Sequence, residues 1–173
     1  GFEGCRETTF LERKAPMYND LKHLKKAGCD VIIYSCHWGK EYSPTHNQTQ
    51  IRMADYAIKN GADIVVGTHP HCVQGIDERG GGVVLWSLGN LVFGGTHDMT
   101  TFDALVVQAV LSFENGKYQG VTLKLMPVLT SSDRPRNNFQ PEFATGGDYD
   151  RIMQLIQDDS TLPIGPEMWF EAK

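Results

Sequence analysis

Helical and strand-like patterns alternate along the first part of the chain. Apolar residues recur at helical spacing over residues 17–27, which predicts a helix with Pro16 near its first turn and Gly28 as its stop. Residues 30–36 are a short apolar, β-branched run, which predicts a buried strand. Residues 1–16 show weak periodicity, and we expect them to form an arm.

The same order of elements then recurs. A polar loop over 40–47 leads to a helical pattern over 48–60, which ends at Asn60-Gly61, and then to a second apolar run over 63–67. Successive helix–strand units of this kind are typical of parallel strands in an α/β sheet. Such sheets bind ligands at the carboxyl ends of their strands.

The second half of the chain has a different pattern. Shorter strands broken by glycine are expected at 73–76, 82–88 and 91–93, and two longer strands, 104–113 and 118–128, flank the hairpin sequence Glu114-Asn115-Gly116. A loop over 130–147, an amphipathic helix over 149–157 and a tail from Thr161 complete the chain. We therefore expect one α/β domain over 1–173, with its core in 17–128, a loop, helix and tail in 129–173, and parallel strands preceding antiparallel ones.

Composition and charge narrow the class of protein. The chain is 40% hydrophobic and 21% charged, as globular domains are. Its formal net charge of −5 argues against a nucleic-acid partner, which usually requires a basic face. The sequence contains no block of lysine or arginine that would indicate binding to an anionic membrane surface.

The cysteines and the chain start carry less information. Cys5, Cys29, Cys36 and Cys72 include no C-x-x-C pair and are sparse for a disulfide scaffold, so their redox state is left open. No apolar run approaches the roughly 20 residues of a membrane-spanning helix, and no signal peptide is visible. The chain begins at Gly1 without a methionine, as a processed protein or a fragment would.

The informative chemistry lies in His69-Pro70-His71, directly after the second predicted strand. Proline restricts its own φ and disfavours helical backbone at the residue before it, so we expect this segment to be stiff and extended. Alternate side chains of an extended segment share a face, which would bring both imidazoles together as half of a metal site. An isolated His-x-His is, however, a common accident of sequence.

His37 follows the first predicted strand and is the natural third histidine. Its strand should lie parallel and close to the strand before His69, so that three imidazoles can hold one ion. By the same alternation Cys36 and Cys72 should face away from the histidines, as small buried hydrophobic residues. A hydrolytic site with two metals, about 3.5–4 Å apart, would also need bridging carboxylates.

Further candidates each have an ordinary alternative. Asn90, after Gly89 at a strand end, can bond a ligand or a metal-binding histidine, or be a turn residue. Glu41 can contact substrate or support a ligand, or be a solvated loop acid. Trp38 can wall a pocket, although core packing is the simpler expectation. Surface roles are expected for Arg134 and Arg136 in their loop, and ordinary roles for His23, His46 and His97.

Common catalytic motifs are absent from the sequence. It contains no G-x-S-x-G elbow, P-loop or G-x-G-x-x-G. Gly80-Gly81-Gly82 precedes a predicted strand and not a helix, which favours a flexible turn over a phosphate-binding loop.

At the histidine motifs the sequence resembles the CapA, or poly-γ-glutamate capsule-synthesis, family. The matching segments are 36–42 (C-H-W-G-K-E-Y), 61–71 (G-A-D-I-V-V-G-T-H-P-H) and 86–91 (W-S-L-G-N-L), in the family's order and spacing, within residues 17–95. Thr68 stands where members often carry another histidine, and Trp86 and Leu91 stand where tyrosine and phenylalanine are usual.

This family looks like the calcineurin-type metallophosphoesterases. The resemblance implies a partial α/β/β/α sandwich with a divalent metal site, for manganese, zinc or iron, at the strand ends. His37 would match the lone histidine of the late phosphoesterase motifs, and His69 and His71 the paired ones; His37 and His69 would also be catalytic. The aspartates, asparagine and histidine of the early motifs would lie upstream of this chain, so that this stretch alone is expected to be inactive.

The resemblance also implies a role in capsule or poly-γ-glutamate biosynthesis. If the protein is an enzyme, a metal-dependent hydrolase is implied; the alternative is a non-catalytic accessory that binds polymer or partner enzymes in a membrane-associated synthesis complex. The implied partners are an anionic capsule polymer or its precursor and other capsule-synthesis proteins, with membrane contact only through regions outside this chain. The implied location is extracytoplasmic, at the bacterial cell surface.

Overall fold

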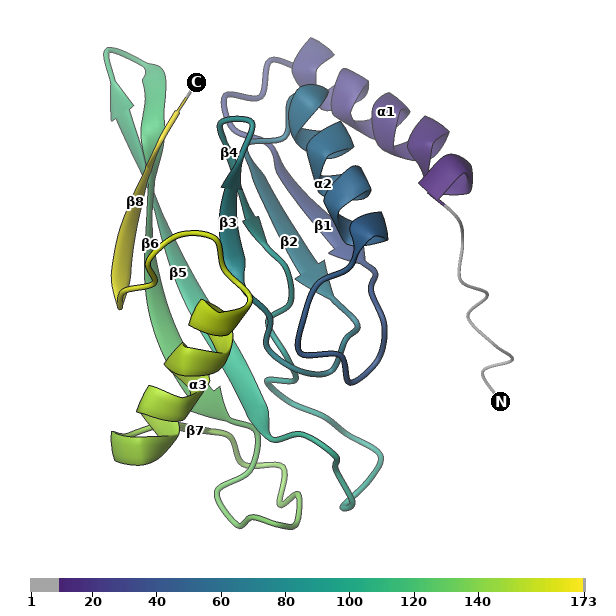
Figure 1. Cartoon of the computed structure of the whole chain (residues 1–173). Helices are drawn as coiled ribbons and strands as arrows, with labels where there is room; N and C mark the ends of the chain where they lie inside the picture. The colour runs from purple at the N-terminus through teal and green to yellow at the C-terminus, as the bar shows by residue number, and fades with distance from the viewer. Residues whose placement is uncertain (1–9, 173) are drawn as a thin grey trace.

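The computed structural model describes residues 10–172 and contains two sheets, with α1 and α2 against the first sheet and α3 beside the second (Figure 1). The helices and strands are α1 (Phe10–Lys26), β1 (Ile33–His37), α2 (Gln48–Lys59), β2 (Ile64–Thr68), β3 (Ile76–Arg79), β4 (Gly82–Leu85), β5 (Asp103–Glu114), β6 (Lys117–Leu129), β7 (Glu142–Phe143), α3 (Gly146–Asp158) and β8 (Glu167–Glu171).

The first sheet has the strand order β1-β2-β4-β3. β1, β2 and β4 are parallel, and β3 leads through the turn at Gly80-Gly81 into β4, its antiparallel partner. The register pairs His37 with Thr68. The carboxyl ends of β1 and β2 therefore lie side by side, and the loops that follow them start from the same edge.

The second sheet is antiparallel and is built on the long β5–β6 hairpin. Asn115 and Gly116 at its tip have φ values of 50° and 75°, the conformation that tight hairpin turns require and that Asn-Gly favours. β7 and β8 both pair with β6. The predicted change from parallel to antiparallel strands is thus confirmed, as is the α/β class.

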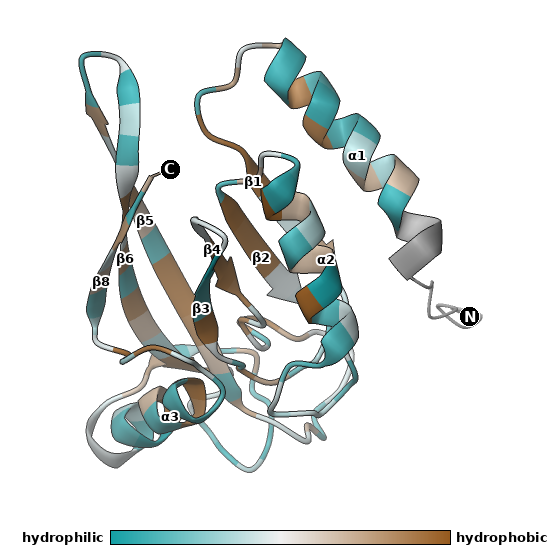
Figure 2. Ribbon diagram, turned by 45° about the horizontal axis from the view of Figure 1, so that its top comes forward, coloured by the Kyte–Doolittle hydropathy of each residue, from teal (hydrophilic) through white to brown (hydrophobic). Residues whose placement is uncertain are grey.

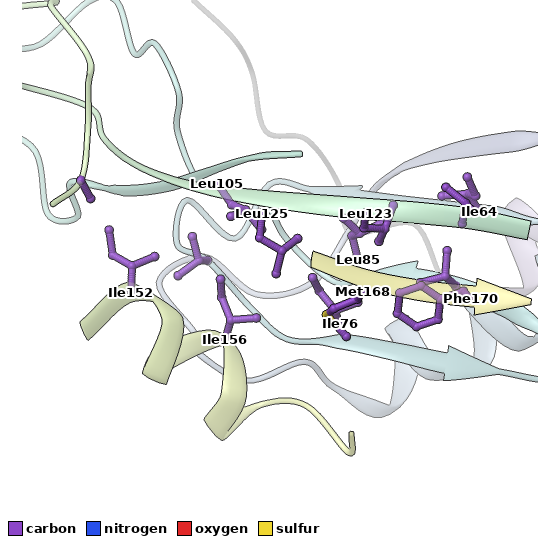
Figure 3. Close-up of a cluster of buried hydrophobic side chains, with 14 of the residues drawn as sticks. Ile64, Ile76, Leu85, Leu105, Leu123, Leu125, Ile152, Ile156, Met168 and Phe170 are labelled. Atoms are coloured by element: carbon purple, nitrogen blue, oxygen red, sulfur yellow. The ribbon is translucent and has the colours of Figure 1, made fainter. Parts of the chain in front are cut away.

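Apolar side chains form a core on each face of the first sheet. On one face α1 and α2 pack through Met17, Leu21, Ala54 and Ala57 against Val65, Val84 and Trp86, and their outward surfaces are largely hydrophilic (Figure 2). On the other face Ile64, Ile76 and Leu85 meet Leu105, Leu123 and Leu125 of the second sheet, and Ile152 and Ile156 of α3 close this core (Figure 3). This layering is the partial α/β sandwich that was predicted.

α2 begins one residue after a strong local signal. The Asn47 side chain accepts hydrogen bonds from Thr49 N (2.9 Å) and Gln50 N (3.1 Å), and Gln50 Oε1 accepts one from Asn47 N (3.0 Å). This reciprocal capping satisfies backbone donors at the helix start. The Gln50 side chain is fully buried and also donates to Gln74 Oε1 (2.9 Å), which ties the helix to the loop after β2.

Several boundaries differ from the sequence prediction. α1 already includes Phe10, so Pro16 lies inside the helix and the predicted arm is wrong from residue 10 onward; its earlier part lies outside the described residues. Residues 91–93 are not a strand, because Leu91 and Val92 are exposed in a loop. The tail contains β8, whose Met168 and Phe170 are buried against the core. None of the helices in the described part of the chain is long and apolar enough to cross a membrane.

Candidate metal site

Three histidines gather at the edge where β1 and β2 end. The ring centroids of His37 and His69 are 4.5 Å apart, and those of His69 and His71 are 5.9 Å apart. His37 is the last residue of β1, and the other two follow Thr68, the last residue of β2. The predicted convergence of these rings is therefore present in the structure.

The backbone route to this convergence differs from the expectation. His69 and His71 have φ values of 100° and 59°, so the segment is not extended but turns sharply on either side of Pro70. Positive φ is rare for residues with a side chain and costs about 1–3 kcal/mol per residue, and such strain is concentrated at functional sites. The prediction of an extended segment was wrong because it used only the restrictions that Pro70 imposes locally.

Donor atoms of Glu41, His69 and His71 all lie within 4.8 Å of one another. Glu41 is exposed and the two histidines are half-buried, so the group faces solvent on one side. His37 is not a member of this group; it lies beside His69, with its Nδ1 3.5 Å from Thr68 Oγ1. The sequence-predicted trio of histidines thus becomes a pair of histidines with a carboxylate, and His37 is their neighbour.

His71 is held in one orientation. Its Nδ1 is 2.9 Å from Asn90 Oδ1, which can only accept a hydrogen bond. The Nδ1 of His71 must then carry the proton, which leaves the Nε2 lone pair for a ligand. Hydroxyl groups fix the same region, because Thr101 donates to the His71 carbonyl and Thr130 donates to the Asn90 carbonyl.

Aromatic rings enclose His71. Tyr42 stacks on it with centroids 5.7 Å apart and an interplanar angle of 28°, and Phe93 meets it edge-on at 5.5 Å. Neither ring was a predicted site residue. Tyr42 follows Glu41 directly and belongs to the H-W-G-x-E-Y segment, which is a signal for it, whereas nothing local in the sequence indicates Phe93.

The loop that carries Glu41 is tied to the loop after β2. Tyr42 N donates to Pro70 O (2.7 Å), and both Gln74 Nε2 (2.9 Å) and Cys72 Sγ (3.0 Å) donate to Ser43 O. These bonds join the two loops between the two histidines and directly after them. They explain how an exposed glutamate lies close to His69 and His71.

Trp38 does not contribute a wall to this site. It is buried on the helix side of the first sheet, and its Nε1 donates to Trp86 O (2.9 Å). The close approach requires Gly67 between them, because a Cβ there would lie 2.0 Å from Trp86 O. Core packing, the simpler of the two expectations for Trp38, is thus found in place of a ligand contact, because strand alternation sends Trp38 and His37 to opposite faces.

None of the cysteines within residues 10–172 belongs to this group of donors. Cys36 is buried, as predicted, but Cys72 is only half-buried and donates to Ser43 O. Burial, with a smaller effect of Asp159 and Asp103, raises the pKa of Cys72 to about 11, so it stays a neutral thiol. Cys29, Cys36 and Cys72 are free of disulfides, and Cys5 lies outside the described residues.

The remaining sequence candidates lie in different settings. Arg134 pairs with Asp148 (2.7 Å), and Arg136 is exposed. His97 Nδ1 is 2.8 Å from Asn137 O, which is an ordinary structural contact, as expected. His46 was also expected to be ordinary, but it lies against both Trp86 and Asp159.

The donor set fits a divalent transition metal. Imidazole binds zinc, iron and manganese, and a pair of histidines with one carboxylate is a known catalytic zinc ligand set. The accepting oxygen of Asn90 behind His71 supplies the outer support that metal-binding histidines usually have. The donor set is thus compatible with a metal ion that keeps one side open to solvent.

Comparisons with known proteins agree with the motifs around this site. Residues 4–95, over half of the chain, match the family described as bacterial capsule synthesis protein PGA_cap. The chain is 39% identical over 85 residues to the capsule biosynthesis protein CapA of Bacillus anthracis, covering 49% of this chain and 21% of the relative. It is 35% identical over 94 residues to the PGA biosynthesis protein CapA of Bacillus subtilis (strain 168), covering 54% of this chain and 25% of the relative.

The matches to the curated relatives span about a quarter or less of those proteins. The family match over residues 4–95 includes every member of the histidine cluster. With more than half of its length matched by the family description, the chain belongs to the bacterial capsule synthesis (PGA_cap) family.

Proposed function

We propose that this chain supplies the histidine half of a divalent metal site in a hydrolase-like capsule biosynthesis protein. Glu41, His69 and His71 hold the ion, and the observation that carries this proposal is the convergence of their donor atoms within 4.8 Å. His37, beside His69, is the fourth donor or the group that exchanges a proton with the substrate. The ion would be manganese, zinc or iron.

A bound ion would polarise a phosphoryl or acyl oxygen and lower the pKa of bound water. The residues of this chain would bind the ion, orient the histidine ligands and shield them from water. Asn90 keeps the Nε2 of His71 available, while Tyr42 and Phe93 limit the access of water to one side of that ring. The strained backbone at His69 and His71 presents both rings to the same ligand.

The biological setting in this proposal comes from the relatives, whose names assign them to capsule and PGA biosynthesis. The substrate would be an anionic capsule polymer such as poly-γ-glutamate, or its precursor, handled outside the cytoplasm together with other capsule-synthesis proteins. Contact with the membrane would be made by regions outside this chain. The net charge of −5 supports the expectation that nucleic acid is not a partner.

A non-catalytic accessory function is the second candidate. The cluster in the described part of the chain holds a single carboxylate, Glu41, whereas a hydrolytic pair of metals needs bridging carboxylates. In this alternative a single ion would fix the loops after β1 and β2 for contact with polymer or with partner enzymes.

The test uses the full-length protein and its His69→Ala/His71→Ala variant, with His23→Ala on α1 as a matched control for loss of an exposed histidine. The proposal expects the double variant to lose bound metal and hydrolysis of phosphodiesters with manganese or zinc, and the control to keep both. Unchanged metal content in the double variant rejects the metal site. The accessory function is favoured if the parent shows no hydrolysis and the double variant loses its metal but still supports polymer production in cells.

A further inference from the structure

Two glutamines with buried side chains contact the loop that carries Glu41. Gln50 lies in the first turn of α2 and is fully buried, and Gln74 lies in the loop after β2 and is 1% exposed. We propose that these two glutamines are positioning residues of the metal site, which keep the Glu41 carboxylate within reach of His69 and His71. The inference rests on the proposed function and deepens it, because it identifies what fixes the one carboxylate among the donors.

The hydrogen bonds of the two amides run in one direction. Asn47 N can only donate, so Gln50 presents Oε1 to it (3.0 Å) and turns Nε2 toward Gln74. The Ser43 carbonyl can only accept, so Gln74 presents Nε2 to it (2.9 Å) and offers Oε1 to Gln50 (2.9 Å). Cys72 Sγ donates to the same carbonyl (3.0 Å), but a thiol is a weak donor. Because both ends of this chain of bonds are backbone groups, neither amide can turn over without leaving buried groups unpaired.

The two amides contact the loop on both sides of Glu41. Two residues after Glu41, the Ser43 carbonyl accepts the bond described above. Two residues before it, a Cβ built on Gly39 would lie 3.0 Å from Gln50 Oε1 and 3.1 Å from Pro70 Cγ. The backbone of Gly39 is therefore packed closely against the Gln50 amide and against the proline ring between the two histidines. Glu41 thus lies midway between two points of the loop that the glutamines hold.

The position of Glu41 depends on the backbone more than on its own side chain. That side chain is exposed, so packing restrains it little. The next residue, Tyr42, has a φ of 58° and donates its N–H to Pro70 O (2.7 Å). Positive φ at a residue with a side chain is unfavourable and persists only where the surrounding structure holds it. The contacts of the two glutamines on either side supply part of that hold.

The test measures the Mn²⁺ affinity of the full-length protein by calorimetry, in a double-mutant cycle of Gln74→Met and Glu41→Ala. Methionine is also long and unbranched, but it removes both hydrogen bonds of the amide. We expect Gln74→Met alone to weaken Mn²⁺ binding about 10-fold, as loss of a residue that supports metal ligands does. In the Glu41→Ala background the same substitution should have no further effect, because the residue that it positions is gone.

The control is Gln157→Met on α3. This half-buried glutamine also bonds two backbone groups, Ile164 N (2.8 Å) and Leu162 O (3.2 Å), but it does not contact the loop of Glu41. It should keep the Mn²⁺ affinity of the parent. Gln50→Met removes the other amide and should show the same coupling to Glu41→Ala, so it carries the test if Gln74→Met does not fold. Thermal unfolding midpoints above the titration temperature establish that each variant is folded.

A second measurement requires no metal. Hydrogen exchange of the Tyr42 amide, which is bonded to Pro70 O, reports opening of the loop. In metal-free protein we expect this exchange to be about tenfold faster in Gln74→Met than in the parent, as for the loss of one hydrogen bond, and unchanged in Gln157→Met.

Three results would overturn the positioning role: an unchanged affinity and Tyr42 exchange in Gln74→Met, a loss of affinity that adds fully to that of Glu41→Ala, or an equal loss in Gln157→Met. If the parent binds no Mn²⁺ but Tyr42 exchange rises in Gln74→Met alone, the glutamines still hold the loop and the metal site is rejected. The two proposals therefore fail separately.

Discussion

His46 and Asp159 are 113 residues apart in the chain, yet His46 Nδ1 lies 2.9 Å from Asp159 Oδ1. The Asp159 carboxylate also accepts hydrogen bonds from His46 N (3.1 Å) and Gly75 N (2.9 Å). The imidazole stacks on Trp86, with centroids 4.2 Å apart. The residue that follows α3 thus fixes both the loop that carries Glu41 and the loop after β2.

This arrangement predicts that Asp159→Ala lowers metal affinity, although Asp159 is not one of the three donors. The variant leaves His46 N and Gly75 N without their buried partner, so we expect a loss of about 1–3 kcal/mol in the free energy of unfolding. Mn²⁺ affinity should fall as well, because the loop of Glu41 gains freedom. Chemical denaturation and metal titration measure the two effects. Asp158→Ala, the exposed neighbour on α3, should change neither, and an equal effect of both substitutions would contradict the role of Asp159.

Gly67 is expected to be intolerant of any side chain. An added Cβ would lie 2.0 Å from Trp86 O and 2.3 Å from Trp38 Nε1, so β2 and β4 would have to separate. We expect Gly67→Ala to lower the free energy of unfolding by about 3 kcal/mol, as overpacked cores do. Gly94→Ala is the control, since nothing lies within 4 Å of its added Cβ. Similar urea midpoints for both variants would show that the sheet can accommodate the methyl group.

The sequence predicted those features that depend on local periodicity. The repeated helix–strand pattern of residues 17–67 placed His37 and His69 at the carboxyl ends of neighbouring parallel strands, and their rings do meet. The predicted start of the second helix at residue 48 is also correct, and the structure shows that it is capped by residues only three apart, Asn47 and Gln50. Such features require no knowledge of distant contacts.

Features that depend on distant contacts were not predictable. The turn through His69 and His71 is held by bonds from Tyr42 to Pro70 and from Asn90 and Thr101 to His71, which come from the loop after β1 and the connection between β4 and β5. Glu41 joins the cluster for the same reason. β8 was missed because its apolar residues, Met168 and Phe170, acquire their burial only by pairing with β6.

Asn90 is predicted to control the metal affinity of His71. Replacement by alanine removes the acceptor of the Nδ1 proton, so the imidazole can rotate or change tautomer. Loss of such a supporting partner typically costs about 10- to 100-fold in metal affinity. We expect this loss in Asn90→Ala and a substantial recovery in Asn90→Asp, which restores an accepting oxygen. Metal titration followed by Co²⁺ absorption checks both. An affinity unchanged in Asn90→Ala would show that His71 is not oriented by this contact.

Acid should weaken the contact between α3 and the loop before it. Hydrogen bonds from Arg134 and then Arg151 lower the pKa of Asp148 below its usual value of about 3.9. The unfolded chain therefore binds a proton at Asp148 more readily than the folded chain does, so stability rises with pH in this window. The stabilising contribution of Asp148 is complete above about pH 4 and is lost as the pH falls through the lowered pKa.

Thermal unfolding between pH 2 and pH 7 should show a smaller acid-induced fall of the unfolding midpoint in Asp148→Asn than in the parent. Asp150→Asn, exposed on the same helix, should follow the parent curve, and 0.5 M salt should reduce the difference because these ion pairs are partly solvated. If the Asp148→Asn and parent curves run parallel, Arg134 and Arg151 do not stabilise the folded chain through Asp148.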